Sequence, residues 1–173
     1  RDIYIPHYTD KDIEAFSIGE KLNIRNYALS FTSKASDVVN LRRLFKNKIN
    51  VTSKIESKKG LKNLSEILKE ADNILIDRGD LSKEVPLHEI PKTQKQIISR
   101  ALKAKTPVYV ATNLLESMVT RMEPTRAEVN DVYNTLIDGV TGLVLAAETA
   151  IGKYPEKCIE MIIKISKTVK NVK

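Results

Sequence analysis

The chain alternates short apolar or β-branched runs with longer amphipathic stretches, and this alternation restricts the folds open to it. The runs lie at residues 27–31, 50–54, 73–76, 107–111 and 142–146. Such near-continuous runs are typical of parallel strands covered on both faces. Between them, apolar side chains recur at helical spacing, as in Leu61, Leu64, Ile67 and Leu68. The order predicts five β/α units, with one further helix at residues 10–22 in front.

Strand–helix alternation indicates a parallel sheet with helices outside it. Two architectures fit: a doubly wound open sheet, and part of an eight-stranded barrel. A complete barrel needs eight units and about 250 residues, whereas this chain has 173. No Gly-rich phosphate-binding fingerprint follows the first strand, which disfavours a dinucleotide-binding fold. We therefore predict the α/β class and a partial TIM-type (β/α)8 barrel of about five parallel β/α units.

Charge and composition narrow the classes of partner. The chain carries 29 Lys plus Arg against 22 Asp plus Glu, with aromatics at only 5%. The lysines are dispersed and not interleaved with stacking aromatics, so nucleic-acid binding is not expected. The apolar runs are too short to cross a bilayer, so no membrane partner is expected. Cys158 is the single cysteine, which excludes an intrachain disulfide and favours a cytoplasmic location. The chain starts at Arg1 without a Met, as expected of a piece of a longer protein.

Charged residues close the second and third predicted strands. In a β/α barrel, chemistry is carried at the carboxyl ends of the strands. Lys54 and Glu56 end the second strand two residues apart, so they point to the same side of the sheet. Gly79 and Asp80 follow the third strand, where a glycine lets the backbone approach a ligand and exposes its N–H groups. Two carboxylates from neighbouring strands, completed by water and substrate, are a usual way to hold Mg²⁺.

Thr112 adds a hydroxyl at the end of the fourth strand. Simpler explanations exist for each position. Lys54 and Glu56 can form a plain salt bridge at a strand end, and Thr112 can cap a helix that starts at Asn113. The hypothesis of a functional site rests on the coincidence that polar residues close three successive strands.

Several segments resemble motifs of the pyruvate kinase family, in the same order. They are residues 53–56 (SKIE), 78–81 (RGDL), 111–118 (ATNLLESM), 124–128 (PTRAE) and 148–150 (ETA). The resemblance covers nearly the whole chain. It implies that residues 1–173 form the second half of the catalytic barrel domain. The first strands of the barrel, the inserted lid domain and the C-terminal domain of the family are absent from this chain.

The resemblance also implies roles for individual residues. Lys54 would stabilise the enolate and the transferring phosphoryl group, and Glu56 and Asp80 would bind Mg²⁺ or Mn²⁺. Backbone N–H groups around Gly79 and Asp80 would hold the substrate carboxylate, and the Thr112 hydroxyl would contact it and help to protonate the enolate. The implied reaction converts phosphoenolpyruvate and ADP to pyruvate and ATP. A K⁺ site would have its ligands outside this chain, a homo-oligomer is expected, and the isolated segment should be inactive.

Some positions depart from the family pattern. Ala146 and Ala147 stand where the family has Ser-Gly, and that serine is implied in the proton relay. Asp77 replaces a small residue, and its carboxylate would repel the substrate unless it points away or pairs with Arg78. Ser82-Lys83 and Asn113 also differ. Two alternatives therefore stay open: a Mg²⁺-dependent lyase or aldolase acting on a pyruvate enolate, and a catalytically impaired regulatory relative.

Overall fold

The strands form one parallel sheet. The computed structural model describes residues 8–170. Its strands are β1 (Asn26–Leu29), β2 (Asn50–Ile55), β3 (Asn73–Asp77), β4 (Val108–Ala111) and β5 (Gly142–Val144). Their spatial order is their chain order, and every neighbouring pair is parallel. A doubly wound sheet requires a reversal of strand order, so the partial-barrel prediction is confirmed.

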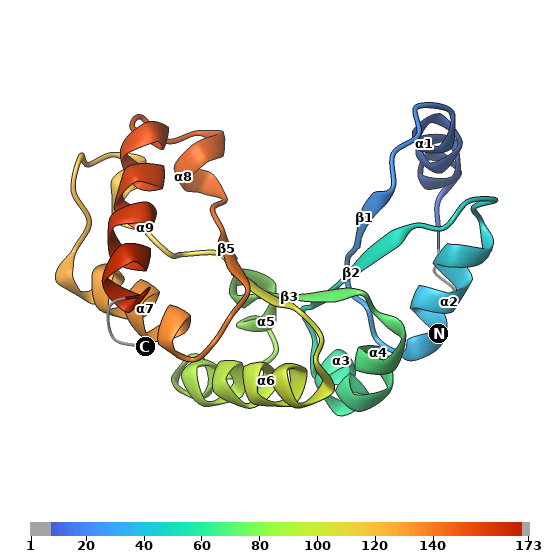
Figure 1. The fold of residues 1–173 in the computed structure, drawn as a ribbon, viewed down its shortest axis with the longest axis horizontal. Helices are drawn as coiled ribbons and strands as arrows, with labels where there is room; N and C mark the ends of the chain where they lie inside the picture. Colours follow the sequence, from blue (N-terminus) through green and yellow to red (C-terminus); the bar gives the residue numbers. More distant parts are fainter. Residues whose placement is uncertain (1–7, 171–173) are drawn as a thin grey trace.

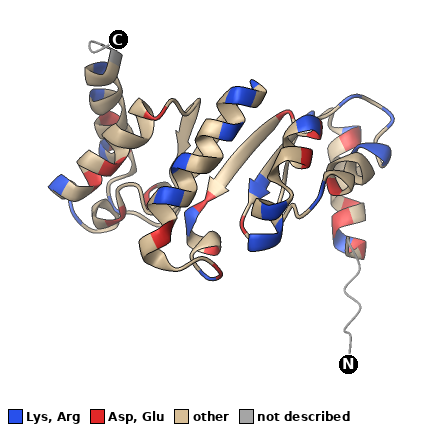
Figure 2. Cartoon of the chain, turned by 90° about the horizontal axis from the view of Figure 1, so that it is seen from below, with Lys and Arg blue, Asp and Glu red and all other residues tan. Residues whose placement is uncertain are grey.

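Helices follow the strands along the outside of the sheet. They are α1 (Asp10–Lys21), α2 (Ala35–Arg43), α3 (Lys58–Lys62), α4 (Leu64–Glu70), α5 (Arg78–Leu81), α6 (Ile90–Ala104), α7 (Arg126–Ile137), α8 (Ala147–Ala150) and α9 (Pro155–Lys170), with 3₁₀ turns η1 (Leu87–Glu89) and η2 (Glu116–Val119). In Figure 1 the molecule is an open arc, with α6, α3 and α4 on its outer side beneath β3. Within residues 8–170, no helix combines the length and apolarity needed to span a bilayer. Figure 2 shows basic residues on several helices rather than in one patch.

The main core lies between the sheet and its outer helices. In β3, Ile74 and Ile76 are fully buried and pack in one cluster with Ile97 of α6 and Val110 of β4. The alternate residues of β3, including Leu75, are only half-buried. The sequence predicts strands covered on both faces, but the inner face stays partly open because the described strands do not close into a barrel. This open inner face is the side on which polar residues can gather.

The two outermost strands lead to a prediction for the isolated segment. Within the described residues, β1 and β5 each pair with one neighbour only, which leaves a row of backbone donors and acceptors free on each edge. We expect the segment expressed alone to self-associate, so that sedimentation detects species heavier than its 19.5 kDa monomer. A Val144→Lys change should reduce this association, because a charge on the β5 edge opposes pairing. A stable monomer across a concentration series would contradict the prediction.

Candidate functional site

The carboxyl ends of β2, β3 and β4 bring the predicted site residues together. The register pairs Ile55 with Ile76 and Asp77 with Ala111. This alignment sets Glu56 and Asp77 side by side, with Thr112 directly beyond the end of β4. Glu56, Asp77 and Asp80 each offer a carboxylate oxygen, and these oxygens lie within 4.8 Å of one another. Parallel strands in register therefore build one polar cluster from residues that are far apart in the chain.

Lys54 is the cation at the centre of this cluster. Its Nζ lies 2.7 Å from Glu56 Oε1 and 3.2 Å from Asp77 Oδ2. The prediction that Lys54 and Glu56 share one side of the sheet is confirmed, and they do form the simple ion pair considered as an alternative. Burial lowers the pKa of Lys54, but the hydrogen bonds and charges of Glu56 and Asp77 outweigh burial, so the pKa is raised overall. Lys54 is therefore held as a cation.

Asp77 makes contacts that the sequence analysis did not foresee. Its Oδ1 accepts a hydrogen bond of 2.8 Å from the Thr112 hydroxyl, while its Oδ2 faces Lys54. Burial raises the pKa of Asp77, but the Thr112 hydroxyl and the Lys54 ammonium more than offset this, and the pKa is lowered overall. Asp77 thus neither points away from the site nor pairs with Arg78, so neither condition that would spare the substrate from its charge is met. The ionic partner of Asp77 is the partly buried Lys54 ammonium inside the site.

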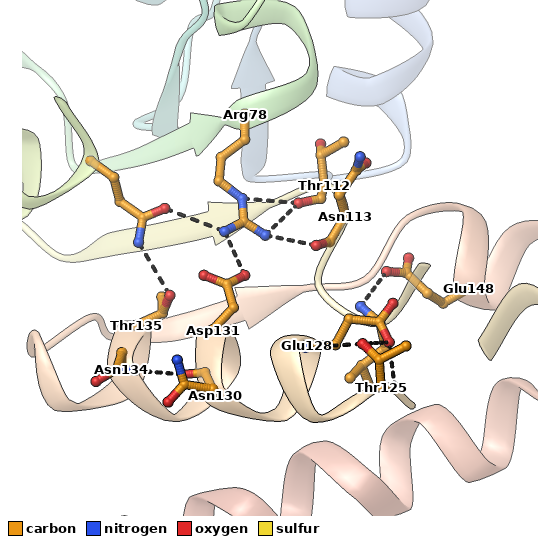
Figure 3. A network of polar contacts seen from close by, with 12 residues as sticks. Arg78, Thr112, Asn113, Thr125, Glu128, Asn130, Asp131, Asn134, Thr135 and Glu148 are labelled. Atoms are coloured by element: carbon orange, nitrogen blue, oxygen red, sulfur yellow. Dashed lines mark hydrogen bonds and ion pairs between the residues drawn. The ribbon is translucent and has the colours of Figure 1, made fainter. Parts of the chain in front are cut away.

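Arg78 instead fixes the backbone after β4 (Figure 3). Its Nε and Nη2 donate to the Thr112 carbonyl at 3.0 and 2.7 Å, and Nη2 also donates to the Asn113 carbonyl at 2.9 Å. Its Nη1 lies 2.7 Å from Asp131 of α7. Thr112 and Asn113 have φ values of 76° and 55°. This left-handed conformation is uncommon for a β-branched residue such as Thr112, where it costs about 1–3 kcal/mol. No helix starts at Asn113, so the alternative role of Thr112 as a helix cap is wrong.

Gly79 is required by how closely Thr112 approaches. A Cβ added at Gly79 would lie 2.8 Å from Thr112 Cγ2, which is shorter than any normal carbon–carbon contact. The RGD sequence after β3 therefore has a structural explanation. Arg78 holds the Thr112 backbone, Gly79 leaves room for its methyl group, and Asp77 binds its hydroxyl.

The carboxylate cluster has the chemistry of a hard-cation site. Glu56 is 1% exposed, and its Oε1 receives no hydrogen bond of regular geometry beyond the nearby Lys54 ammonium. Its Oε2 accepts the Phe31 backbone N–H, which fixes the carboxylate. Asp80 pairs at 2.6 Å with Lys83, whose side chain is 75% exposed. Carboxylate oxygens from neighbouring strands suit Mg²⁺ or Mn²⁺, so these residues fit the metal that the sequence resemblance implies.

Two other segments that resemble family motifs, PTRAE and ETA, are explained by structural hydrogen bonds. Glu128 accepts the Ser117 backbone N–H at 2.7 Å and also the Thr125 N–H at 2.7 Å, so it caps α7 and holds η2 against it (Figure 3). Glu148 accepts the backbone N–H groups of Leu115 and Ala146 at 3.0 and 2.8 Å. Both glutamates thus tie the segment after β4 to the helices that follow.

Sequence reasoning missed three side chains near the predicted site: Asp77, Arg78 and Lys83. Each had been noted, but none had been assigned the contact that it makes. A run of alternating charges around a single glycine, from Asp77 to Lys83, was the available signal. It could not show which charges face one another, because that depends on the turn after β3.

Comparisons with known proteins agree with this arrangement. The family model for the barrel domain of pyruvate kinase matches residues 1–159. A pyruvate kinase from Thermotoga maritima is 43% identical over 96% of this chain and 36% of its own length. Pyruvate kinases from Sporosarcina psychrophila and Thermococcus litoralis are 37% and 40% identical, over 96% and 92% of this chain and 29% and 34% of their own. The chain spans about a third of the length of these curated relatives. On this evidence, the chain belongs to the pyruvate kinase family and carries part of its barrel domain.

Proposed function

We propose that this segment supplies the metal-binding and phosphoenolpyruvate-binding half of a pyruvate kinase site, in which phosphoenolpyruvate and ADP give pyruvate and ATP. The reaction belongs to the parent chain, by which we mean the longest natural polypeptide that contains these residues. One observation carries the proposal. A half-buried cation and three carboxylates converge at adjacent strand ends, at the positions where the family motifs lie.

The site residues would have three separate roles: binding the metal, stabilising negative charge and binding the substrate carboxylate. Glu56 and Asp80 would hold Mg²⁺ or Mn²⁺, which when bound supplies positive charge to the phosphoryl and enolate oxygens. Lys54 adds a second positive charge that stabilises the same oxygens. The Thr112 hydroxyl and the N–H groups of Gly79 and Asp80 would bind the substrate carboxylate. Phosphoryl transfer depends on placing positive charge and aligning groups more than on covalent chemistry, and Lys54 is already held as a cation.

The remaining parts of the proposal concern the whole protein. Residues 1–173 would form the second half of the catalytic barrel, so the K⁺ ligands and most ADP contacts would come from outside this segment. The loop at residues 124–128 would lie near a contact between copies in a homo-oligomer. The protein would act in the cytoplasm on small soluble substrates.

The second candidate is a Mg²⁺-dependent lyase that acts on a pyruvate enolate. Ala146 favours it, because this residue offers only its backbone N–H at the position where the family pattern has a relay serine. Such an enzyme needs the same metal and the same cation, but no nucleotide. Its substrates would be 4-hydroxy-2-oxo acids, which release pyruvate when the carbon–carbon bond breaks.

Pyruvate formation by the parent chain separates the two functions. The assay combines phosphoenolpyruvate, ADP and Mg²⁺, and each component is omitted in turn. A pyruvate kinase produces pyruvate and ATP in equal amounts and stops when ADP or Mg²⁺ is withheld. Pyruvate release from a 4-hydroxy-2-oxo acid without ADP, together with no turnover of phosphoenolpyruvate, would replace the proposal with the lyase.

Lys83 gives a prediction about metal affinity. Its ammonium pairs with Asp80, so it competes with a divalent cation for that carboxylate. Because exposed ion pairs are weak, Lys83→Ala should tighten Mn²⁺ binding by only roughly two- to fivefold, measured from the electron paramagnetic resonance signal of free Mn²⁺. Lys95→Ala is the matched control, since it removes a lysine paired with Asp138 instead. Weaker Mn²⁺ binding in Lys83→Ala would show that Lys83 does not compete for the metal ligand.

A further inference from the structure

The Asp77 carboxylate binds the Thr112 hydroxyl and the Lys54 ammonium, which would bind the substrate in the proposed function. Its Oδ1 accepts the Thr112 hydroxyl at 2.8 Å, and its Oδ2 lies 3.2 Å from the Lys54 ammonium. A substrate carboxylate and enolate oxygen would need the same hydroxyl and the same ammonium. An internal carboxylate therefore stands where an external one should bind.

The position of Asp77 leaves it little freedom to move aside. It ends β3 in register with Ala111, its side chain is 14% exposed, and aspartate has only two rotatable side-chain bonds. Gly79 lies against it as well, since a Cβ at Gly79 would be 3.5 Å from Asp77 Oδ1. To release Thr112 and Lys54, Asp77 must give up both of its side-chain partners at once.

Two effects therefore oppose a bound carboxylate. The first is occupancy, because the hydroxyl and the ammonium already have a partner. The second is repulsion, because two carboxylates that share one site cannot both stay ionised at no cost. Like charges placed together at a binding surface cost several kcal/mol. Neither effect depends on the parts of the barrel that lie outside this segment.

We propose that Asp77 is an internal competitor of the substrate carboxylate, and so sets the affinity of this site for phosphoenolpyruvate and pyruvate. The inference rests on the proposed function for the identity of the ligand. It assigns Asp77 a role in specificity, acting through Thr112 and Lys54. In the resting site, Asp77 accepts the Thr112 hydroxyl and pairs with the Lys54 ammonium. On substrate binding it must be displaced, which weakens the affinity for any small carboxylate.

Calorimetric titration of the parent chain with pyruvate in the presence of Mg²⁺ tests this directly. Asp77→Ala, which restores a small side chain, should lower the Kd for pyruvate by roughly tenfold or more. Asp77→Asn keeps the volume and an oxygen for the Thr112 hydroxyl but removes the charge. Its Kd for pyruvate should therefore lie between the values for the unmodified chain and for Asp77→Ala. Asp138→Ala, which removes a carboxylate paired with Lys95, should leave the Kd unchanged. Circular dichroism of each variant confirms that it folds.

The outcomes separate this inference from the proposed function. A pyruvate Kd that is unchanged or larger in both Asp77 variants would overturn the inference, and would show that Asp77 only positions its partners. Tighter pyruvate binding in Asp77→Ala, with no turnover of phosphoenolpyruvate and ADP in any variant, would support the inference while the kinase function fails. Turnover by the parent chain with an unchanged KM for phosphoenolpyruvate in Asp77→Ala would keep the function and reject the inference.

Discussion

Replacing Lys54 with alanine in the parent chain is expected to reduce the rate of pyruvate formation by about 10²–10³-fold. Lys54 is the cation at the centre of the site, 2.7 Å from Glu56 and 3.2 Å from Asp77. Negative charge develops on the enolate and on the transferring phosphoryl group during the reaction. A fixed positive charge stabilises these groups most in the transition state, so its loss lowers kcat more than it changes substrate binding.

The same substitution should leave the metal in place. Glu56 and Asp80 are unchanged in Lys54→Ala, and Glu56 no longer pairs with an ammonium. Binding of Mn²⁺ should therefore be as tight as in the unmodified chain, or tighter. Lys59→Ala, which removes an exposed lysine of α3, is the matched control and should keep full activity. Activity retained in Lys54→Ala would exclude Lys54 from the chemistry, and lost Mn²⁺ binding would indicate that the site had collapsed.

Replacing Arg78 with alanine should loosen the segment after β4. The guanidinium donates to the Thr112 and Asn113 carbonyls and pairs with Asp131, and its side chain is only 12% exposed. Its removal leaves polar groups without partners and leaves the left-handed turn at Thr112 unsupported. The free energy of local opening should fall by about 3 kcal/mol. This corresponds to roughly hundredfold faster amide hydrogen exchange in residues 112–118.

Hydrogen exchange followed by mass spectrometry on the parent chain measures this local change. Arg42→Ala is the matched control, because it removes an ion pair with Asp72, which directly precedes the first residue of β3. It should leave exchange in residues 112–118 unaltered. Arg78→Lys should rescue little, since a lysine cannot reproduce the fork of donors that spans both carbonyls and Asp131. Unchanged protection of residues 112–118 in Arg78→Ala would mean that Asp77 and Gly79 hold the turn alone.

Hydrophobic periodicity was sufficient to predict the sheet. Strand interiors such as Ile74 and Ile76 of β3 are buried, and short apolar runs separated by helical patterns allow few other arrangements. The order of the units then placed Lys54, Glu56, Asp80 and Thr112 at one end of the sheet, because parallel strands all present their carboxyl ends to the same edge. The prediction failed on the inner face, which is half-exposed because covering it requires more strands than these residues provide.

Side-chain pairing inside the site could not be predicted in the same way. Asp77 and Arg78 are adjacent in the chain, and a pair between them was one of two arrangements in which Asp77 would not repel the substrate. In the fold they point to different partners, Asp77 to Lys54 and the Thr112 hydroxyl, and Arg78 to backbone carbonyls and Asp131. Consecutive residues at a strand end face opposite ways. Strand register therefore decides which distant residue each of them meets, and periodicity in one strand carries no information about register between strands.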